Sequence, residues 1–366
     1  MTKTIKGPKV LIAARRGHIT EVEMIKGLRD RGVDIHAAFA SDSPLLERLR
    51  DNDIPTRTLD LKHNADLGKA FRIRRWIKEE GFDIVHGLAN RQVANFIWAS
   101  VGLSNKVIAY RGAIGHVSRW DPTCYVKWLN PRIDKIVCVS KGVKRDLAAN
   151  GVRPDKLVTI YKGHDLDWYK DLDPVQARKE LNAEFGIPQG AVLVGMAANM
   201  RRVKGADLLM RALMDLPDYV HGLFIGEVRD PLVRKLATHP TIKNRVHLAG
   251  YRNEAVRLIG ALDVNVAPSR GREGLTKSII EGMVQGVPSV VSDAGGLPEL
   301  VADENPSPVF PAGDLSRLTA LIQQTIERGA GNDGLNTRQS RLPSRFLLDS
   351  TIEQTHELYK ELAEDL

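Results

Sequence analysis

Cysteine and aromatic residues are scarce in this chain of 366 residues. The two cysteines, Cys124 and Cys138, cannot form a disulfide framework, and neither lies in a CxxC pair or beside a histidine at metal-site spacing. We therefore expect both to be packing residues and predict no metal site. Aromatic residues make up 5% of the chain, and it has neither zinc-finger spacing nor an aromatic RNA-binding strand. These absences argue against nucleic acid as a partner.

Long hydrophobic runs are also missing. No stretch approaches the roughly 20 apolar residues of a membrane-spanning helix, and the start, MTKTIKGPK, lacks the apolar core of a signal peptide. We therefore expect a cytoplasmic protein.

The excess of basic residues implies an anionic partner, because the net charge is +8. Residues 67–78, LGKAFRIRRWIK, have the spacing of a basic amphipathic helix, which favours contact with a membrane surface. The alternative is a helix that packs through Phe71, Ile73 and Ile77 and exposes its basic face to solvent.

Strand-like and helix-like segments alternate along the chain. The expected strands are Val10–Ala14, Val33–Phe39, Thr56–Leu61, Phe82–Leu88, Lys106–Tyr110, Ile133–Ser140, Ala191–Met196, Gly222–Gly226 and Val246–Gly250. Such alternation predicts α/β domains with doubly wound parallel sheets and ligands at the carboxyl ends of the strands. His86, Arg111 and His116 are expected at or just beyond such ends. A linker is expected around residues 165–178, and a glycine-rich loop at 329–336.

Residues 262–299 form the most informative segment. Val264–Ala267 are β-prone, Thr276–Gln285 have helical spacing with a stop at Gly286, and Ser289–Ser292 form a second strand. Because a crossover helix joins the two strands, they must be parallel.

Two carboxylates and a predicted helix start lie together in this segment. The main-chain N–H groups of Gly274, Leu275 and Thr276 are unpaired donors that favour a phosphate. Glu273 and Glu281 flank them and would repel a phosphate unless they accept hydrogen bonds from hydroxyl groups. Sugar and ribose hydroxyls are such donors, so the pattern favours a sugar nucleotide. The alternative is that both glutamates are solvated.

The sequence of residues 273–301, EGLTKSIIEGMVQGVPSVVSDAGGLPELV, resembles the nucleotide-sugar motif of retaining GT-B glycosyltransferases of the family 4 type. The resemblance implies a GT-B fold, with two Rossmann-like doubly wound domains that face a central cleft. It implies an acceptor-binding domain over residues 1–165 and a nucleotide-sugar domain over 166–340. Residues 341–366 would form a helix that crosses back to the first domain.

The same resemblance assigns cationic groups. Lys204 and Gly205 match a Lys-Gly pair whose lysine contacts the donor diphosphate, but Asn199 stands where the family has an arginine. Arg201 or Arg202 is expected to replace that arginine. Many relatives carry a histidine where this chain has Arg111. A catalytic role for His116 is the hypothesis that it takes the place of that histidine.

The implied activity is retaining transfer of a sugar from a nucleotide diphosphate to a hydroxyl acceptor, with no cofactor and no metal ion. The acceptor would be a glycan or glycolipid of the bacterial cell envelope, such as lipopolysaccharide, at the cytoplasmic face of the inner membrane. Arg15, Arg16, Arg111 and Arg119 suit a phosphorylated acceptor. The alternatives are a sugar-nucleotide epimerase on the same scaffold and a non-catalytic binder of sugar nucleotides or anionic polymers.

Overall fold

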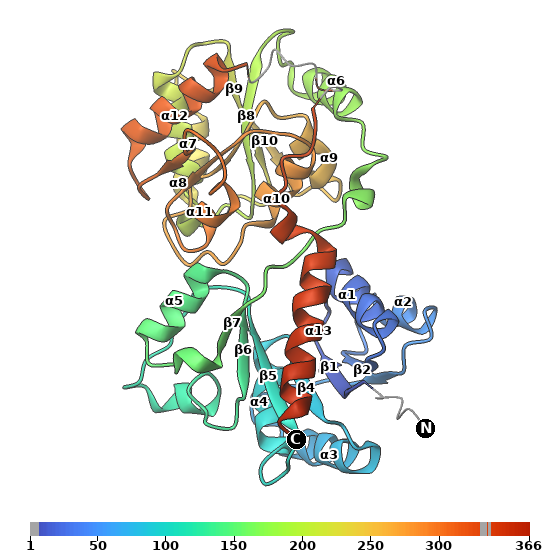
Figure 1. The fold of residues 1–366 in the computed structure, drawn as a ribbon. Helices are drawn as coiled ribbons and strands as arrows, with labels where there is room; N and C mark the ends of the chain where they lie inside the picture. The colour runs from blue at the N-terminus through green and yellow to red at the C-terminus, as the bar shows by residue number, and fades with distance from the viewer. Residues whose placement is uncertain (1–6, 330–334, 336–337) are drawn as a thin grey trace. The chain divides into compact units, whose positions relative to one another are not determined.

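The computed structural model describes residues 7–329, 335 and 338–366. It divides into two compact units (Figure 1). Unit 1 comprises Met1–His164 and Ser344–Leu366, and unit 2 comprises Asp165–Pro343. Most of the glycine-rich loop expected at 329–336 lies outside the described residues.

Unit 1 is built on a seven-stranded sheet with the order β3-β2-β1-β4-β5-β6-β7. All of its strand pairs are parallel, which confirms the doubly wound architecture. The strands are β1 (Lys9–Ala13), β2 (Asp34–Phe39), β3 (Thr56–Thr58), β4 (Ile84–Gly87), β5 (Lys106–Arg111), β6 (Lys135–Cys138) and β7 (Leu157–Thr159). The edge strand β3 is shorter than predicted because its partner β2 ends at Phe39, which lies opposite Thr58.

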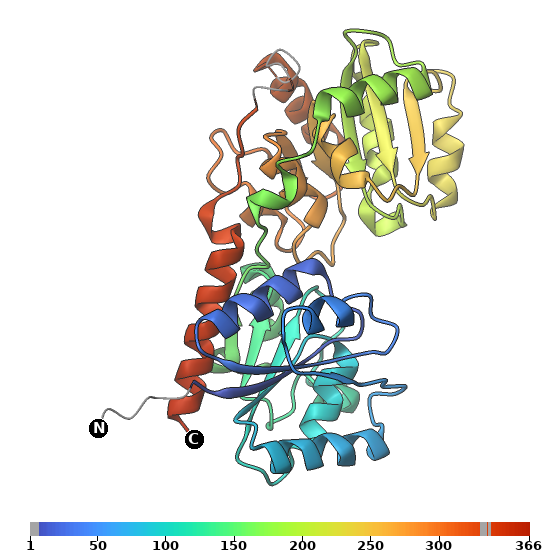
Figure 2. The same ribbon diagram turned by 90° about the vertical axis from the view of Figure 1, so that its right-hand side faces the viewer.

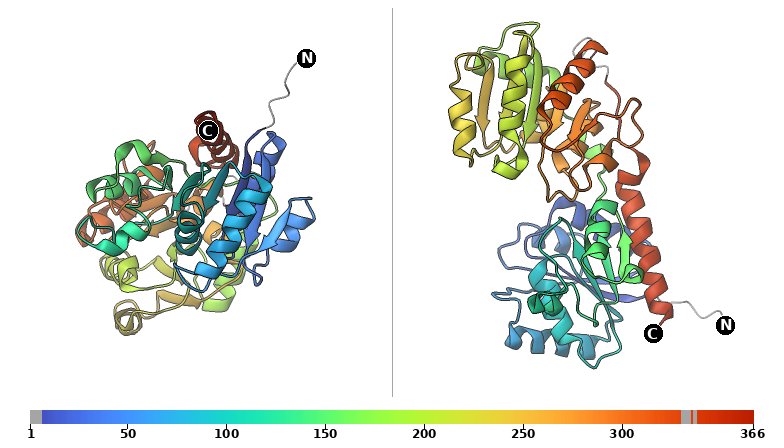
Figure 3. Two further views of the ribbon diagram at one scale, coloured as in Figure 1. Left: turned by 90° about the horizontal axis from the view of Figure 1, so that it is seen from below. Right: turned by 90° about the vertical axis from the view of Figure 1, so that its left-hand side faces the viewer.

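Helices cover both faces of the unit 1 sheet. They are α1 (Ile19–Asp30), α2 (Leu46–Arg50), α3 (Leu67–Glu80), α4 (Asn90–Ala99), α5 (Lys141–Ala149) and α13 (Leu348–Glu364). Apolar residues of α1, α2 and α13 share one core with the strands. Helices α3 and α4 lie on the opposite face (Figure 3). The approach of α13 to α1 is close, since a Cβ on Gly27 would lie 2.4 Å from Ile352 Cδ1.

The basic helix α3 packs differently from the expected pattern. Ile73 and Ile77 are buried as expected, but Phe71 is 71% exposed and Trp76 is buried in its place. The expectation that α3 packs through Phe71 was therefore wrong, because Phe71 and Trp76 lie on different sides of the helix. The Arg72 guanidinium lies 5.0 Å from the centre of the Trp76 ring. No helix among the described residues is both long and apolar enough to cross a membrane.

Unit 2 carries a six-stranded parallel sheet with the order β10-β9-β8-β11-β12-β13. Its strands are β8 (Val192–Ala197), β9 (Val220–Ile225), β10 (Val246–Gly250), β11 (Val264–Ala267), β12 (Ser289–Ser292) and β13 (Val309–Phe310). Its helices are α6 (Pro174–Phe185), α7 (Ala206–Asp215), α8 (Pro231–Ala237), α9 (Ala255–Gly260), α10 (Lys277–Val284), α11 (Leu297–Leu300) and α12 (Leu315–Glu327). Apolar residues of α7, α8 and α12 belong to one core, and those of α6 and α9 belong to a second. Figure 2 shows the backbone of unit 2 from another side.

The predicted strand-helix-strand segment is confirmed. Strands β11 and β12 are parallel, and α10 runs between them with Thr276 and Gln285 as its caps. Gly286 follows with a φ of 72°, a left-handed conformation that suits glycine at a helix end. The three elements therefore place residues 268–276 at the carboxyl edge of the sheet.

Candidate functional site

Two loops meet at the centre of the unit 2 sheet. Strands β8 and β11 are neighbours, with Val264 opposite Val194. Helix α7 after β8 belongs to one core, whereas α10 after β11 packs beside α9 of the other core. The strand order reverses at this point, which is where ligands bind in open α/β sheets. Residues 198–205 and 268–276 are the loops at this position.

The predicted residues Lys204 and Glu273 contact each other across these loops. Lys204 Nζ lies 2.6 Å from Glu273 Oε1. The hydroxyl groups of Ser269 and Thr276 donate to the same carboxylate over 2.7 and 3.2 Å. The Glu273 side chain is only 8% exposed, and that of Lys204 is 22% exposed. The carboxylate is thus held in one orientation, with the lysine reaching it from the solvent side.

Gly205 allows the two loops to approach each other. Its φ is 71°, and a Cβ at this position would lie 1.9 Å from the main-chain oxygen of Pro268. A side chain therefore has no room here. The Arg270 guanidinium donates to the main-chain oxygen of Arg202 over 2.9 Å and joins the same loops a second time, and it donates to both carboxylate oxygens of Asp207 on α7 over 2.7 Å. Sequence reasoning missed this pair, because 63 residues separate its members.

Free hydrogen-bond donors line the start of α10. The main-chain N–H groups of Gly274, Leu275 and Thr276 donate to no acceptor in the part of the chain that the structure describes. The Thr276 hydroxyl does not cap the helix because it donates to Glu273. Three amides and a helix N-terminus can together hold an anion.

Two arginines follow β8 on the loop that carries Lys204. Arg201 and Arg202 are exposed, and neither side chain forms a hydrogen bond or ion pair within residues 7–329, 335 and 338–366. Asn199, which stands at the family's arginine position, is also exposed. Both guanidinium groups are thus available for a ligand of unit 2.

Glu281 is the second predicted carboxylate, and it is buried on α10. Burial raises the pKa of its carboxyl group, and the opposing effect of Lys277 is smaller. Lys277 Nζ lies 2.9 Å from Glu281 Oε1. Sequence reasoning missed Lys277, although a lysine four residues before a glutamate is a recognisable helical pair.

Unit 1 has its own pocket, which we call the unit 1 pocket. Its volume is about 810 Å³, and the segments that follow β1 to β5 line it, at residues 15, 40–42, 59–62, 88–92 and 110–115. Arg15 and Lys62 are exposed in this lining, and their side chains form no hydrogen bond or ion pair with any described residue. The strand order reverses between β1 and β4, so the pocket also lies at a topological switch point.

The sequence-predicted groups of unit 1 separate in the structure. His86 lies near a strand end as expected, since it is the next-to-last residue of β4. Its side chain does not line the unit 1 pocket, because α13 covers this position and the His86 Nδ1 lies 2.8 Å from the Tyr359 hydroxyl. Burial lowers the pKa of His86 to about 3.

The four arginines expected to suit a phosphate also differ in their surroundings. Arg15 and Arg111 line the unit 1 pocket, but Arg111 is buried with its guanidinium 4.4 Å from the centre of the Trp128 ring. Burial lowers the pKa of Arg111. Arg16 forms an ion pair with Asp42, and the Arg119 guanidinium lies 5.7 Å from the Trp120 ring centre.

His116 follows β5 on a loop that continues from the lining of the unit 1 pocket. Its Nε2 lies 2.8 Å from Asp121 Oδ2. Cys124 and Cys138 are both buried, as expected of packing residues. Cys124 nevertheless lies close to His116 and Asp121, which the sequence spacing did not indicate.

Each unit matches a family of known proteins. Residues 21–168 match the model described as Glycosyltransferase Family 4, and residues 191–328 match the model described as Glycosyl transferases group 1.

Individual relatives extend these matches. The chain is 24% identical to the UDP-Gal:alpha-D-GlcNAc-diphosphoundecaprenol alpha-1,3-galactosyltransferase of Escherichia coli, over 96% of this chain and 94% of that protein. It is 30% identical to the lipopolysaccharide core biosynthesis mannosyltransferase LpcC of Rhizobium leguminosarum bv. viciae, over 56% of this chain and 57% of the relative. Among solved structures, Anabaena HepE in complex with UDP has a TM-score of 0.79 at 20% identity, over 97% of this chain and 100% of HepE. This last likeness concerns the fold alone.

Proposed function

Because this chain belongs to the GT-B glycosyltransferases, with a family 4 domain followed by a group 1 domain, we propose that it transfers a sugar from a nucleoside diphosphate to a hydroxyl acceptor with retention of configuration. The contact between Lys204 and Glu273 beside the free amides of residues 274–276 carries this proposal. It groups a cation, an anion-binding turn and an oriented hydroxyl acceptor, which are the groups that a nucleotide sugar needs.

The donor would bind in unit 2. The diphosphate would accept hydrogen bonds from the amides of residues 274–276 and from Lys204, with Arg201 or Arg202 as a further cation. Glu273 would accept from hydroxyl groups of the sugar. Glu281, which is buried and paired with Lys277, would accept from the ribose. Lys204 would then change partners from the carboxylate to the phosphate as the donor enters.

The chemistry follows from where negative charge develops. As the glycosidic bond breaks, charge grows on the leaving diphosphate, so fixed cations and amides stabilise the transition state more than the ground state. These groups would supply the stabilisation without a metal ion. The leaving phosphate oxygen would take the proton of the acceptor hydroxyl on the same face of the sugar, which gives retention.

The acceptor would bind in unit 1. The unit 1 pocket exposes Arg15 and Lys62, two cations without an ion-pair partner among the described residues. They suit a phosphate group on the acceptor. The E. coli relative is named for UDP-galactose and a diphosphoundecaprenol-linked acceptor, so UDP-sugars and lipid diphosphates are the first substrates to test. We predict that His116 orients the acceptor hydroxyl.

A glycolipid acceptor would require contact with a membrane surface, which we place at the cytoplasmic face of the inner membrane. Helix α3 supports this because Leu67 and Phe71 are exposed on a helix that also carries Lys69, Arg72 and Arg75. Exposed apolar side chains among basic ones favour anionic bilayers.

Thermal shift with UDP, GDP, ADP and CMP, alone and as sugar conjugates, tests the donor site. One nucleotide at a hundred times its Kd should stabilise the wild-type protein by about 2.7 kcal/mol. Lys204→Ala and Glu281→Ala should lose this shift. Lys26→Ala should keep it, because Lys26 pairs with Glu23 on α1 of unit 1. No shift with any nucleotide would contradict the proposal.

The product distinguishes transfer from the alternatives. The coupling constant of the anomeric proton in the new linkage should show the configuration of the donor, and inversion would contradict retention. An epimerised sugar released without any acceptor requirement would indicate an epimerase. Binding without turnover would indicate a binding protein.

A further inference from the structure

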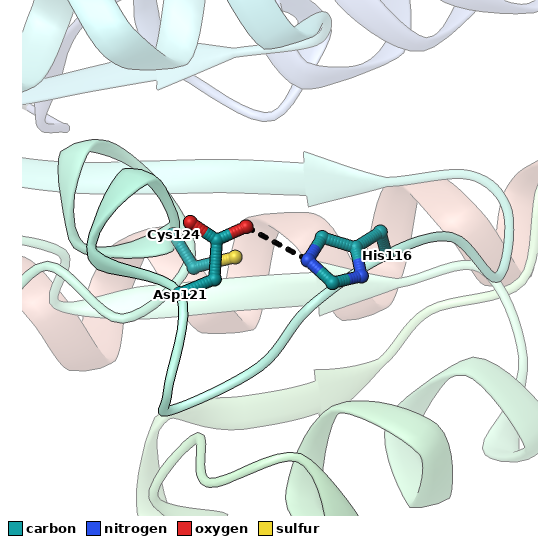
Figure 4. Close-up of side chains that lie close together, drawn as sticks. All are labelled: His116, Asp121 and Cys124. Carbon is teal, nitrogen blue, oxygen red and sulfur yellow. Dashed lines mark hydrogen bonds and ion pairs between the residues drawn. The ribbon is translucent and has the colours of Figure 1, made fainter.

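The loop after β5 folds back on itself and brings together three side chains, of which the proposed transfer uses only His116. His116, Asp121 and Cys124 point toward one another (Figure 4). Each offers one ligand atom, and these three atoms all lie within 4.8 Å of one another. This is the only such grouping of three His, Cys, Asp or Glu residues that the described part of the chain contains. We propose that His116, Asp121 and Cys124 bind one Zn²⁺ ion.

The three donors are those that zinc prefers. Zinc binds imidazole nitrogen, carboxylate oxygen and thiolate sulfur at about 2.0–2.3 Å, usually as a tetrahedron. Neighbouring donors of such a tetrahedron lie roughly 3.3–3.8 Å apart. Since the observed ligand atoms already lie within 4.8 Å of one another, modest side-chain rotations reach this geometry. The thiol favours zinc over calcium or magnesium, which bind oxygen ligands.

The proton balance of binding is simple. His116 Nε2 and Asp121 Oδ2 now share a hydrogen bond of 2.8 Å. Zn²⁺ would take the place of this shared proton, and the neutral imidazole would move its single proton from Nε2 to Nδ1, so that the histidine would release none. Cys124 would bind as thiolate and release one proton to solvent.

The surrounding turn already orients the carboxylate. Asp121 Oδ1 accepts hydrogen bonds from the Thr123 main-chain N–H over 2.9 Å and from its hydroxyl over 2.7 Å. Oδ2 is therefore directed away from Thr123 and toward His116. Asp121 also caps the 3-10 helix Pro122–Val126, which carries Cys124. One short turn thus fixes two of the three ligands, as partners behind metal ligands do in known sites.

Burial divides the site into an inner and an outer side. Cys124 is 5% exposed, whereas the His116 side chain is 71% exposed. The thiolate would hold the ion from the protein side and the imidazole from the solvent side. A water molecule or an acceptor oxygen would complete the tetrahedron, since the described residues supply only three ligands.

A bound ion would fix the loop beside the unit 1 pocket. Residues 112–115 line this pocket and precede His116 directly. Zinc binding itself is independent of the proposed transferase activity.

The test uses the full-length protein after removal of metals with a chelator. Co²⁺ should bind at one equivalent per chain and produce a sulfur-to-cobalt charge-transfer band, and Zn²⁺ should displace it. Cys124→Ser should abolish the band. Thr123→Val, which removes a hydrogen bond to the ligand Asp121, should weaken Co²⁺ binding by about tenfold, within the range of about 10–100-fold for residues that hold metal ligands. His116→Ala and Asp121→Asn remove ligands themselves and should weaken binding by more than this range.

The matched control is Cys138→Ala, which removes the other cysteine, buried in β6. This variant should keep the band and the affinity. Loop order gives a second measurement, because trypsin cleaves after Arg119 between two of the proposed ligands. Zinc should slow this cleavage at least about tenfold in the wild-type protein and leave it unchanged in Cys124→Ser.

Two results would overturn the proposal. One is wild-type protein without a charge-transfer band at micromolar concentrations. The other is equal affinity in Cys124→Ser and the wild type. If His116 instead orients the acceptor hydroxyl through a free Nε2, His116→Ala would reduce kcat although the wild-type protein binds no zinc.

Discussion

Replacement of Lys204 by alanine tests whether its contact with Glu273 belongs to a donor site. A fully buried ion pair costs about 3–5 kcal/mol to break, and an exposed pair costs about 0–1 kcal/mol. This pair lies between these limits, because Lys204 reaches solvent and Glu273 keeps hydrogen bonds from Ser269 and Thr276. We expect the free energy of unfolding to fall by about 1–3 kcal/mol. For a unit of this size the midpoint would fall by about 2–12 °C.

The effect on catalysis should be larger than the effect on stability. If Lys204 holds the leaving diphosphate, its removal should lower kcat about 10²–10³-fold, as for other groups that stabilise developing negative charge. Steady-state transfer with a saturating donor measures kcat separately from KM. Lys204→Arg keeps the charge and should recover part of the rate.

A second lysine provides the control for Lys204→Ala. Lys26 pairs with Glu23 at 2.8 Å on α1, and Lys26→Ala should leave kcat unchanged. Suppose that Lys204→Ala lowers the midpoint but changes kcat less than about threefold, which is under 1 kcal/mol of transition-state free energy. The pair would then be purely structural, and the assignment of the diphosphate site would be refuted.

Three further substitutions test the site and its support. Gly205→Ala should cost at least about 2 kcal/mol in chemical denaturation, because a Cβ there meets main chain, whereas Gly186→Ala, which meets nothing within 4 Å, should cost about 1 kcal/mol. Equal costs would contradict this reason. Burial raises the pKa of Glu281, so the folded protein binds its proton more tightly than the unfolded chain, and stability from this group falls as pH rises above its ordinary value of 4.5. Glu281→Gln should therefore melt higher than the wild type at pH 7 and bind the donor less well, and a lower midpoint would contradict the burial argument. Tyr359→Phe should cost about 1–2 kcal/mol, because His86 loses its hydrogen bond. The pKa of His86 is lowered to about 3, so its stabilising contribution is complete above pH 6.5 and is lost as pH falls toward 3, and a His86 variant should flatten this part of the acid-unfolding profile.

The elements of the donor site could be read from the sequence because local rules determine them. The change from strand to helical spacing after Ala267 and the stop at Gly286 predicted β11, α10 and β12 with nearly the observed bounds. A strand followed by a helix in a parallel sheet places the intervening loop at the carboxyl edge. Lys204 and Glu273 could therefore be assigned to one edge of one sheet before their contact was known.

The tertiary structure decided which side chains meet. The sequence gives no distance between Lys204 and Glu273, which are 69 residues apart, or between Arg270 and Asp207. These contacts depend on the neighbouring places of β8 and β11 in the sheet. For the same reason His86 could not be assigned, since only the position of α13 buries it against Tyr359.

Irregular local structure also limited what could be predicted from the sequence. The proximity of His116, Asp121 and Cys124 depends on a turn after β5 that has neither helical nor strand periodicity. The exposure of Phe71 depends on how α3 is rotated against α4, which its basic pattern does not determine. The sequence alone determined the order of strands and helices and the edge that carries the donor groups, because periodicity and turn chemistry are local. Side-chain direction and pairing were decided only by the tertiary structure, because they depend on neighbours that are distant in the chain.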